Sequence, residues 1–209
     1  MVIPSEYLER HKAAEPPGGV QAEAVWQENV FTDSEMDDII AMNKQIVMEP
    51  GPLGSLELNT GQWENVVDPI IRHCSIGFMF PNDDTEWIFE RVVGTAAKVN
   101  SETFNYELDG LKDGLQLTCY DSEGQHYGWH QDRGFGTFER KLSMTLQLSD
   151  PKDYDGGELE LKWAANPLQA KKERGVATFF PSFTTHRVTP VTRGRRYSLV
   201  AWFVGPPFK

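Results

Sequence analysis

The sequence has few of the features that mark secreted or membrane-bound proteins. Its two cysteines, Cys74 and Cys119, lie in separate apolar stretches and are expected to be small buried thiols, as in a reducing cytoplasm. The apolar runs are too short to span a membrane. The first residues, MVIPSEYLER, lack the basic and apolar regions of a secretory signal. We therefore expect a cytoplasmic protein without a membrane partner.

Positive charge is also scarce. The chain carries 20 Lys and Arg against 31 Asp and Glu, for a net charge of −11, and an acidic surface repels DNA and RNA. Residues 171–196 are an exception, because they hold seven basic residues and a single acid, Glu173. Most such charges only solvate a surface, but one of them can serve an anionic small molecule.

The length of 209 residues, with 39% hydrophobic residues, predicts one domain with a sizeable core. Residues 1–24 are polar, include the stretch EPPGG, and are expected to form a loosely held arm. Residues 25–209 are expected to form the single domain, with supporting helices in 25–110 and a β core in 111–209.

A first helix is predicted at the stretch FTDSEM. Thr32 as N-cap and Glu35 three positions later form a capping box, and Phe31 with Met36 forms a hydrophobic staple around it. The apolar face of this helix is expected to continue as far as Val47.

A second helix is predicted from about Asp84 to Val99, with Asn100 as its stop. Its apolar positions recur at helical spacing: Ile88, Val92, Ala96 and Val99. Between the two helices, the stretch PGPLGSLELNTG is expected to be a loop.

From residue 115 the hydrophobic period changes to two, which predicts strands separated by Gly, Pro and Asp turns. The predicted strands are 115–120, 141–149, 157–163, 175–180 and 195–204. Two helices followed by short antiparallel strands predict an α+β, mainly β fold. The expected architecture is a double-stranded β-helix, the jelly-roll core of cupin-like proteins, braced by helices on one side.

The stretch HYGWHQD, residues 126–132, holds three side chains that commonly bind metals. His126 and His130 have the i, i+4 spacing of a helical zinc site, but glycines interrupt the stretch and no apolar period supports a helix. On an extended strand, His130 and Asp132 point to the same side, roughly 7 Å apart at Cα. With His186 from a neighbouring strand, they would complete a metal site.

The last predicted strand supplies a candidate partner for an anion. Alternation places Arg196, Ser198, Val200 and Trp202 on one face. A buried arginine is costly unless it meets an anion, and a guanidinium beside a hydroxyl suits a carboxylate. Two His, one Asp and a carboxylate clamp are typical of the facial triad that holds Fe(II) with three positions open, enough for a 2-oxo acid and dioxygen.

From about Gln116 to the C-terminus, the chain resembles the iron(II)- and 2-oxoglutarate-dependent dioxygenases, in particular the prolyl 4-hydroxylase-like branch. The stretches that carry the resemblance are YDSEGQHYGWHQD, RKLSMTLQLSD, YDGGELEL and HRVTPVTRGRRYSLVAWF. The resemblance implies decarboxylation of 2-oxoglutarate to succinate with hydroxylation of a C–H bond, and ascorbate as a possible reductant. By position, His130, Asp132 and His186 match the iron ligands.

The resemblance also assigns the cosubstrate pocket. Arg196 matches the basic residue that pairs with the distal carboxylate of 2-oxoglutarate, and Tyr120 matches a tyrosine that meets the cosubstrate. Gln147 stands where some relatives carry another tyrosine, and Trp202 matches an aromatic wall. The stretch GGELEL lacks a threonine that many relatives carry, which leaves Ser198 or Gln147 to supply its hydrogen bond. Collagen-type enzymes often have lysine where Arg196 stands, so collagen-like substrates are not favoured.

Prolyl residues of a peptide or protein are the expected substrate. The alternatives are a dioxygenase acting on a free amino acid or a methylated nucleobase, and a non-catalytic cupin-type barrel that binds metal. We expect the loops 49–63 and 133–140 to select the substrate, because loops at a barrel mouth carry variable contacts. In the second loop, Gly134 and Gly136 would give mobility, and Phe135 and Phe138 would offer apolar contact to a proline ring.

Overall fold

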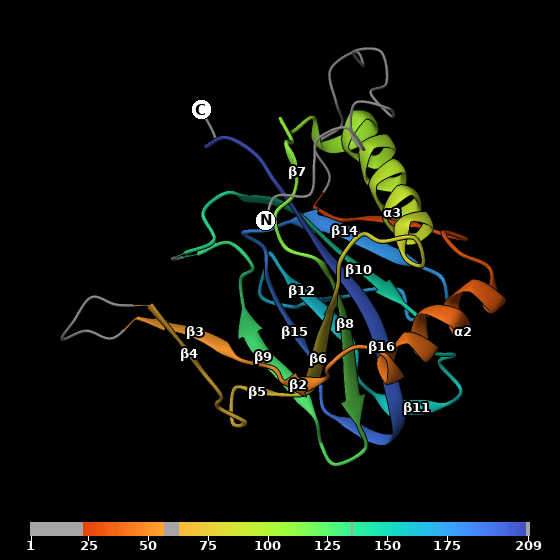
Figure 1. The fold of residues 1–209 in the computed structure, drawn as a ribbon. Coiled ribbons are helices and arrows are strands. Elements are labelled where there is room, and N and C mark those ends of the chain that lie inside the picture. The colour runs from red at the N-terminus through yellow and green to blue at the C-terminus, as the bar shows by residue number, and fades with distance from the viewer. Residues whose placement is uncertain (1–22, 57–62, 135, 208–209) are drawn as a thin grey trace.

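The computed structural model of the protein describes residues 23–56, 63–134 and 136–207, and shows two antiparallel sheets with helices on one side (Figure 1). The predicted arm 1–24 falls almost entirely outside these residues. The double-stranded β-helix architecture is confirmed, since the two sheets face each other and enclose one cavity. No helix within the described ranges is both long and apolar enough to cross a membrane.

The larger sheet has nine strands and runs in the order β1-β14-β10-β16-β8-β6-β2, with β7 and β11 also paired to β16. These strands are β1 (Val25–Gln27), β2 (Glu49–Pro50), β6 (Ser75–Met79), β7 (Gly110–Leu111), β8 (Leu115–Asp121), β10 (Arg140–Gln147), β11 (Tyr154–Gly156), β14 (Ala177–Pro181) and β16 (Val191–Val204). The central position of β16 places its alternating side chains in both the core and the cavity.

The smaller sheet has the order β13-β12-β15-β9-β5, and a separate hairpin joins β3 to β4. The bounds are β5 (Arg72–His73), β9 (His126–His130), β12 (Leu159–Lys162), β13 (Leu168–Gln169) and β15 (Thr185–Val188), with β3 (Leu53–Leu56) and β4 (Trp63–Val66) in the hairpin. The prediction that PGPLGSLELNTG is only a loop was therefore wrong. Strands this short carry too little alternation to be recognised in a sequence.

The first helix, α2 (Asp33–Ala41), begins at the predicted capping box. The Thr32 amide donates to Glu35 Oε2 at 2.8 Å, and the Glu35 amide donates to Thr32 Oγ1 at 3.3 Å. The helix ends earlier than predicted, because the Asn43 side chain donates to the Ile40 carbonyl at 2.7 Å and a short 3₁₀ turn, Met42–Lys44, follows. Val47 lies beyond it and is 77% exposed, so its place on the helical face was wrongly predicted.

The second helix, α3 (Glu86–Val99), buries its predicted apolar positions completely or almost so. The helical path does not stop at Asn100 as predicted, but continues in a π turn, Asn100–Phe104. The Asn100 side chain accepts from the Tyr106 amide and donates to the Tyr106 carbonyl. Asn105 then takes a left-handed conformation, φ 52°, that ends the turn.

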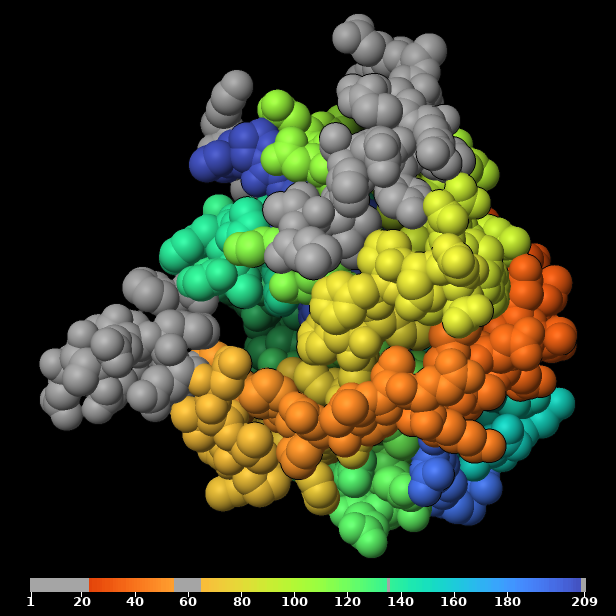
Figure 2. All heavy atoms as spheres, in the orientation of Figure 1, coloured from red at the N-terminus to blue at the C-terminus, as the bar shows by residue number. Residues whose placement is uncertain are grey.

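The two helices cover the outer face of the larger sheet (Figure 1). Figure 2 shows the chain through α2 as a band across this face, with residues 80–100 packed above it. The core beneath contains buried side chains from both helices and from the central strands, among them Ile39, Phe89, Leu117, Met144 and Leu199. A second buried cluster lies between the two sheets and includes Tyr120, Tyr154, Leu161, Phe180 and Val188. The opposite face of the larger sheet is thus free to line a cavity.

Candidate metal and cosubstrate site

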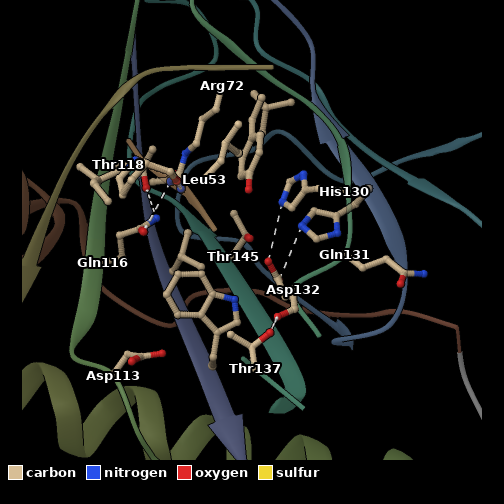
Figure 3. Close-up of a pocket in the computed structure, with 18 of the residues that line it drawn as sticks. Leu53, Arg72, Asp113, Gln116, Thr118, His130, Gln131, Asp132, Thr137 and Thr145 are labelled. Atoms are coloured by element: carbon tan, nitrogen blue, oxygen red, sulfur yellow. Dashed lines mark hydrogen bonds and ion pairs between the residues drawn. The ribbon is translucent and has the colours of Figure 1, made fainter. Parts of the chain in front are cut away.

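The three predicted metal ligands meet beside the paired inner strands β9 and β15 of the smaller sheet. His130 is the last residue of β9 and pairs directly with His186 on β15. Asp132 lies two residues beyond the end of β9, in a bend. His130 Nε2 is 3.7 Å from Asp132 Oδ1, and His186 Nε2 is 3.6 Å from Asp132 Oδ2 (Figure 3). The ligand atoms of the three residues all lie within 4.8 Å of one another.

Backbone carbonyls orient both imidazoles. His130 Nδ1 lies 2.8 Å from the Gly128 carbonyl, and His186 Nδ1 lies 2.9 Å from the Thr184 carbonyl. Because a carbonyl can only accept, each Nδ1 carries a proton and each Nε2 presents a lone pair to the centre of the site. Burial, together with nearby His186, lowers the pKa of His130 to about 3. The imidazole is therefore neutral at ordinary pH, which is the form that binds a metal.

The Asp132 carboxylate is held in its charged form. Burial alone would raise its pKa, but His186, His130 and a hydrogen bond from Ser143 outweigh burial and keep the pKa below its usual range. Ser143 Oγ donates to Asp132 Oδ2 at 2.7 Å and lies 2.9 Å from Ser182 Oγ. Two imidazoles and one buried carboxylate fit a divalent iron ion of the two-histidine, one-carboxylate type.

We expect Ser143→Ala to weaken metal binding by about 10- to 100-fold, as is usual when a group that orients a ligand is removed. The change leaves all three ligands in place but frees the Asp132 carboxylate to rotate. Titration of the protein with Fe(II) under nitrogen measures the effect. Ser149→Ala is the matched control, since Ser149 Oγ accepts from the Tyr197 amide, away from the site. Equal iron affinity in the two variants would contradict the role of Ser143.

The alternative pair, His126 with His130, is not a site. His126 Nδ1 lies 2.9 Å from the Gly124 carbonyl, and its Nε2 lies 3.0 Å from the Ile70 carbonyl. Both ring nitrogens are thus engaged with backbone, and the residue sits on a strand rather than on the helix that this spacing would need. The i, i+4 spacing of His126 and His130 therefore does not indicate a metal site in this protein.

The metal ligands open into a cavity of about 510 Å³ between the two sheets. It is lined from β8 and β16 on one side, from β9 and β15 on the other, and from the β3–β4 hairpin. Of the two loops predicted to select the substrate, the first contributes Pro52, Leu53 and Gly54, and the second contributes Gly134, Thr137 and Arg140. Phe138 is 56% exposed, and Phe135 lies outside the described residues.

Arg196 is buried in the wall of this cavity, with 1% of its surface exposed. Its Nη1 donates to Ser198 Oγ at 3.3 Å, whereas its Nη2 finds no hydrogen-bond partner among the described residues. Gly157 makes room for it, because a Cβ there would stand 2.8 Å from Arg196 Cδ. A buried guanidinium with an unused donor and no carboxylate partner among the described ion pairs fits an anionic ligand.

The other predicted cosubstrate residues divide into two groups. Tyr120, Ser198 and Trp202 line the cavity with Arg196. Burial raises the pKa of Tyr120 well above its usual range, so its hydroxyl stays protonated and can donate. Gln147 is buried but is not among the described residues that line the cavity; Thr145, two positions earlier on β10, lines it instead.

Several cavity residues were not predicted. Gln116 and Thr118 alternate with Tyr120 on β8, so the period-two argument used for β16 would have found them. Arg140 was predicted only as part of the 133–140 loop; its guanidinium lies 4.0 Å above the Trp202 ring and pairs with Asp113 at 2.6 Å. Arg72 and Tyr127 also line the cavity, and no pattern in the sequence marks them.

The fold and site together define a class of protein: a double-stranded β-helix with a two-histidine, one-carboxylate centre and a buried basic residue in one cavity. The sequence pattern of the 2OG-Fe(II) oxygenase superfamily matches residues 115–204, which hold all three metal ligands and Arg196. The match covers less than half of the chain.

Curated relatives and solved structures give a more detailed comparison. A PKHD-type hydroxylase of Synechococcus sp. is 41% identical over 93 residues, 42% of this chain and 41% of its own. One from Sphingopyxis alaskensis is 45% identical over 85 residues, 38% of each chain. The matches thus span about two fifths of the length of these relatives.

Solved structures are similar to this chain over more of its length than the curated relatives are. The structure is similar to that of a Pseudomonas putida prolyl-4-hydroxylase, with a TM-score of 0.66 and 20% identity over 88% of this chain and 93% of that one. A Trichoplax adhaerens prolyl hydroxylase in complex with a hypoxia inducible factor peptide fragment gives a TM-score of 0.71 and 18% identity, covering 87% and 83%. At these identities, the likeness establishes the shared fold.

Proposed function

We propose that the protein is an Fe(II)- and 2-oxoglutarate-dependent dioxygenase that hydroxylates a C–H bond, with prolyl residues of a peptide or protein as its substrate. One observation carries the proposal. The His130, Asp132 and His186 cluster shares a cavity with Arg196, a buried cation that has no acidic partner among the described residues. A metal site alone does not need such a cation, but a site for a metal-bound dicarboxylate does.

The chain's own residues supply positioning and shielding. His130, Asp132 and His186 would hold the iron, and Arg196 with Ser198 would bind the distal carboxylate of 2-oxoglutarate. When bound, the iron activates dioxygen for oxidative decarboxylation of 2-oxoglutarate to succinate and hydroxylation of the substrate. Tyr120 would donate a hydrogen bond from the cavity wall, and Trp202 would keep water from that side. Ascorbate is proposed as a reductant that keeps the iron divalent.

The substrate class is supported by the relatives. The curated matches are named PKHD-type hydroxylases, and the structural neighbours are prolyl hydroxylases, one of them solved with a peptide fragment. We infer that a proline-containing segment enters the cavity between the β3–β4 hairpin and the loop after Asp132. The proposed domain is residues 25–209, with 25–110 supporting the β core.

Nucleic acid is a weaker alternative, because the basic residues of 171–196 are engaged with acids or buried. Lys171 pairs with Glu28, Lys172 with Glu158, Arg174 with Asp37, Arg187 with Glu160, Arg193 with Asp155, and Arg195 with Asp121, while Arg196 is buried in the cavity. These pairs spread over several elements and neutralise the apparent basic patch. A polyanion would have to compete with each of them.

The function is tested in two stages. We expect iron-dependent formation of succinate from 2-oxoglutarate, which distinguishes an oxygenase from a non-catalytic metal-binding barrel. A panel of proline peptides, free proline and methylated single-stranded oligonucleotides is then screened for the mass of one added oxygen atom, or for loss of the methyl group. Proline peptides should react, with binding that changes little as salt is raised. Tight, salt-sensitive oligonucleotide binding with no reaction of peptides would contradict the proposal.

A further inference from the structure

The cavity contains a second buried arginine that the cosubstrate site does not use. Arg72 on β5 is 8% exposed and lines the cavity. Its Nε donates to Cys74 Sγ at 3.3 Å, its Nη1 to the Pro52 carbonyl at 3.0 Å, and its Nη2 to Gln116 Oε1 at 3.5 Å. All of these acceptors are neutral groups, and among the described ion pairs none involves Arg72.

If the proposed function holds, Arg72 is the one charged group in the described cavity lining that lacks a partner of opposite charge. Arg140 is neutralised by Asp113. The divalent iron, Asp132, Arg196 and the doubly charged cosubstrate sum to zero, since +2, −1, +1 and −2 cancel. The charge of Arg72 remains without an anion in a loaded site. Burying a guanidinium without an anionic partner is energetically unfavourable. One further negative group in the loaded cavity would neutralise the charge of Arg72.

Arg72 lies close to the reacting centre. Its Cζ is 4.5 Å from the centroid of the Tyr127 ring, and the Tyr127 ring stacks on His130 with centroids 3.5 Å apart. One aromatic side chain therefore contacts both Arg72 and a metal ligand. In Figure 3 the guanidinium points into the cavity toward Gln116, across from Asp132. A group bound to Arg72 would be a near neighbour of the atom that is hydroxylated.

The guanidinium is also held in place before any ligand arrives. Gln116 Nε2 donates to Thr118 Oγ1 at 2.8 Å, which directs Gln116 Oε1 toward Arg72. On the other side, Gly51 packs against it so closely that a Cβ would stand 2.6 Å from Arg72 Nε. A fixed cation loses little further conformational freedom when it binds an anion, which favours affinity.

We propose that Arg72 binds a carboxylate of the prime substrate and so determines which prolines are accepted. This inference rests on the proposed function and refines it: the favoured substrate carries its negative charge beside the target proline. The carboxylate has two sources, an acidic side chain next to the proline in a peptide or the α-carboxylate of proline itself. The net charge of −11 argues only against extended polyanions, because a single carboxylate meets the local positive charge of the cavity.

The test compares binding of matched ligands to the protein loaded with Mn(II) and 2-oxoglutarate under nitrogen, by calorimetry. Two peptides differ only in aspartate or asparagine beside the proline, and free L-proline and L-prolinamide form a second pair. We expect the wild-type protein to bind the charged member of one pair about tenfold or more tightly. Arg72→Gln should remove this preference and leave affinity for the neutral member unchanged, and Arg72→Lys should keep part of it. Arg187→Gln, which alters a half-buried arginine paired with Glu160 outside the described cavity lining, should behave as wild type.

The outcomes distinguish the two sources of the carboxylate, and they also separate the role of Arg72 from the oxygenase function. A preference in the peptide pair identifies an acidic side chain, and one in the proline pair identifies the α-carboxylate. The role of Arg72 would be overturned if the wild-type protein showed no preference, or if Arg72→Gln lost affinity equally for charged and neutral ligands. Arg72 would then serve only to hold the Pro52 segment in place. Succinate formation is measured in parallel without substrate, so failure of the oxygenase proposal appears there and not in the ligand preference.

Discussion

The Asp132→Ala protein is expected to fold and to form no succinate from 2-oxoglutarate in the presence of iron. Asp132 is the only carboxylate in the described metal cluster, and its two oxygens face both imidazole Nε2 atoms at 3.6–3.7 Å. Removing it leaves two histidine ligands, too few to hold Fe(II) in facial geometry. His130→Ala and His186→Ala should have the same effect, and each loss should be complete within the detection limit of the assay.

The control for this prediction lies on the same strand. His126→Ala removes a histidine whose ring nitrogens contact only backbone carbonyls, and it should retain iron binding and turnover. Circular dichroism and thermal melting establish that the ligand variants are folded. Normal 2-oxoglutarate decarboxylation by a folded Asp132→Ala protein would refute the metal-site assignment.

Arg196→Met is expected to weaken 2-oxoglutarate binding strongly while sparing the metal. Loss of one partner of a buried, charge-assisted pair costs on the order of 2–5 kcal/mol, which corresponds to roughly 30-fold or more in affinity. The KM for 2-oxoglutarate should rise accordingly, and Fe(II) binding without cosubstrate should remain as in wild type. Methionine fills much of the space that arginine leaves.

The neighbouring arginine provides the matched control. Arg195 points to the opposite face of β16, is exposed, and pairs with Asp121 at 2.5 Å. Arg195→Met should therefore leave the KM for 2-oxoglutarate within about twofold of wild type, since exposed ion pairs contribute little. Similar effects of the two substitutions would show that Arg196 has no special role in the cosubstrate site.

Residue periodicity predicted much of this molecule, and the site shows why. Every side chain predicted on the inward face of β16, from Arg196 to Trp202, lines the cavity, because strand alternation is a local property that a sequence displays directly. The helix start at Thr32 was equally local. The meeting of His130 with His186 is a cross-strand contact between distant segments. The strand pattern suggested it, and the resemblance to a family supported it.

The parts that were missed depend on longer-range packing. The hairpin β3–β4 and the strand β5 are short, and pairing with other segments, not local composition, makes them strands. Arg72 is buried because Gly51, Pro52 and Gln116 surround it, and an isolated arginine in a sequence gives no sign of such surroundings. Gln147 is a different case: it lies opposite Ser198 in the sheet register, and Ser198 lines the cavity, yet Gln147 itself is not among the described lining residues.

The two halves of the site belong to different layers of the fold. His130 and His186 stand on the smaller sheet, and Arg196 stands on β16 in the larger one. The separation between metal and guanidinium is therefore set by the thickness of the core between the sheets, where Phe180 packs its ring 4.8 Å from His186. If the proposed function holds, this core sets the length of the diacid that fits between the metal ligands and Arg196. Selection among shorter and longer 2-oxo acids would then depend on apolar side chains that need not touch the cosubstrate.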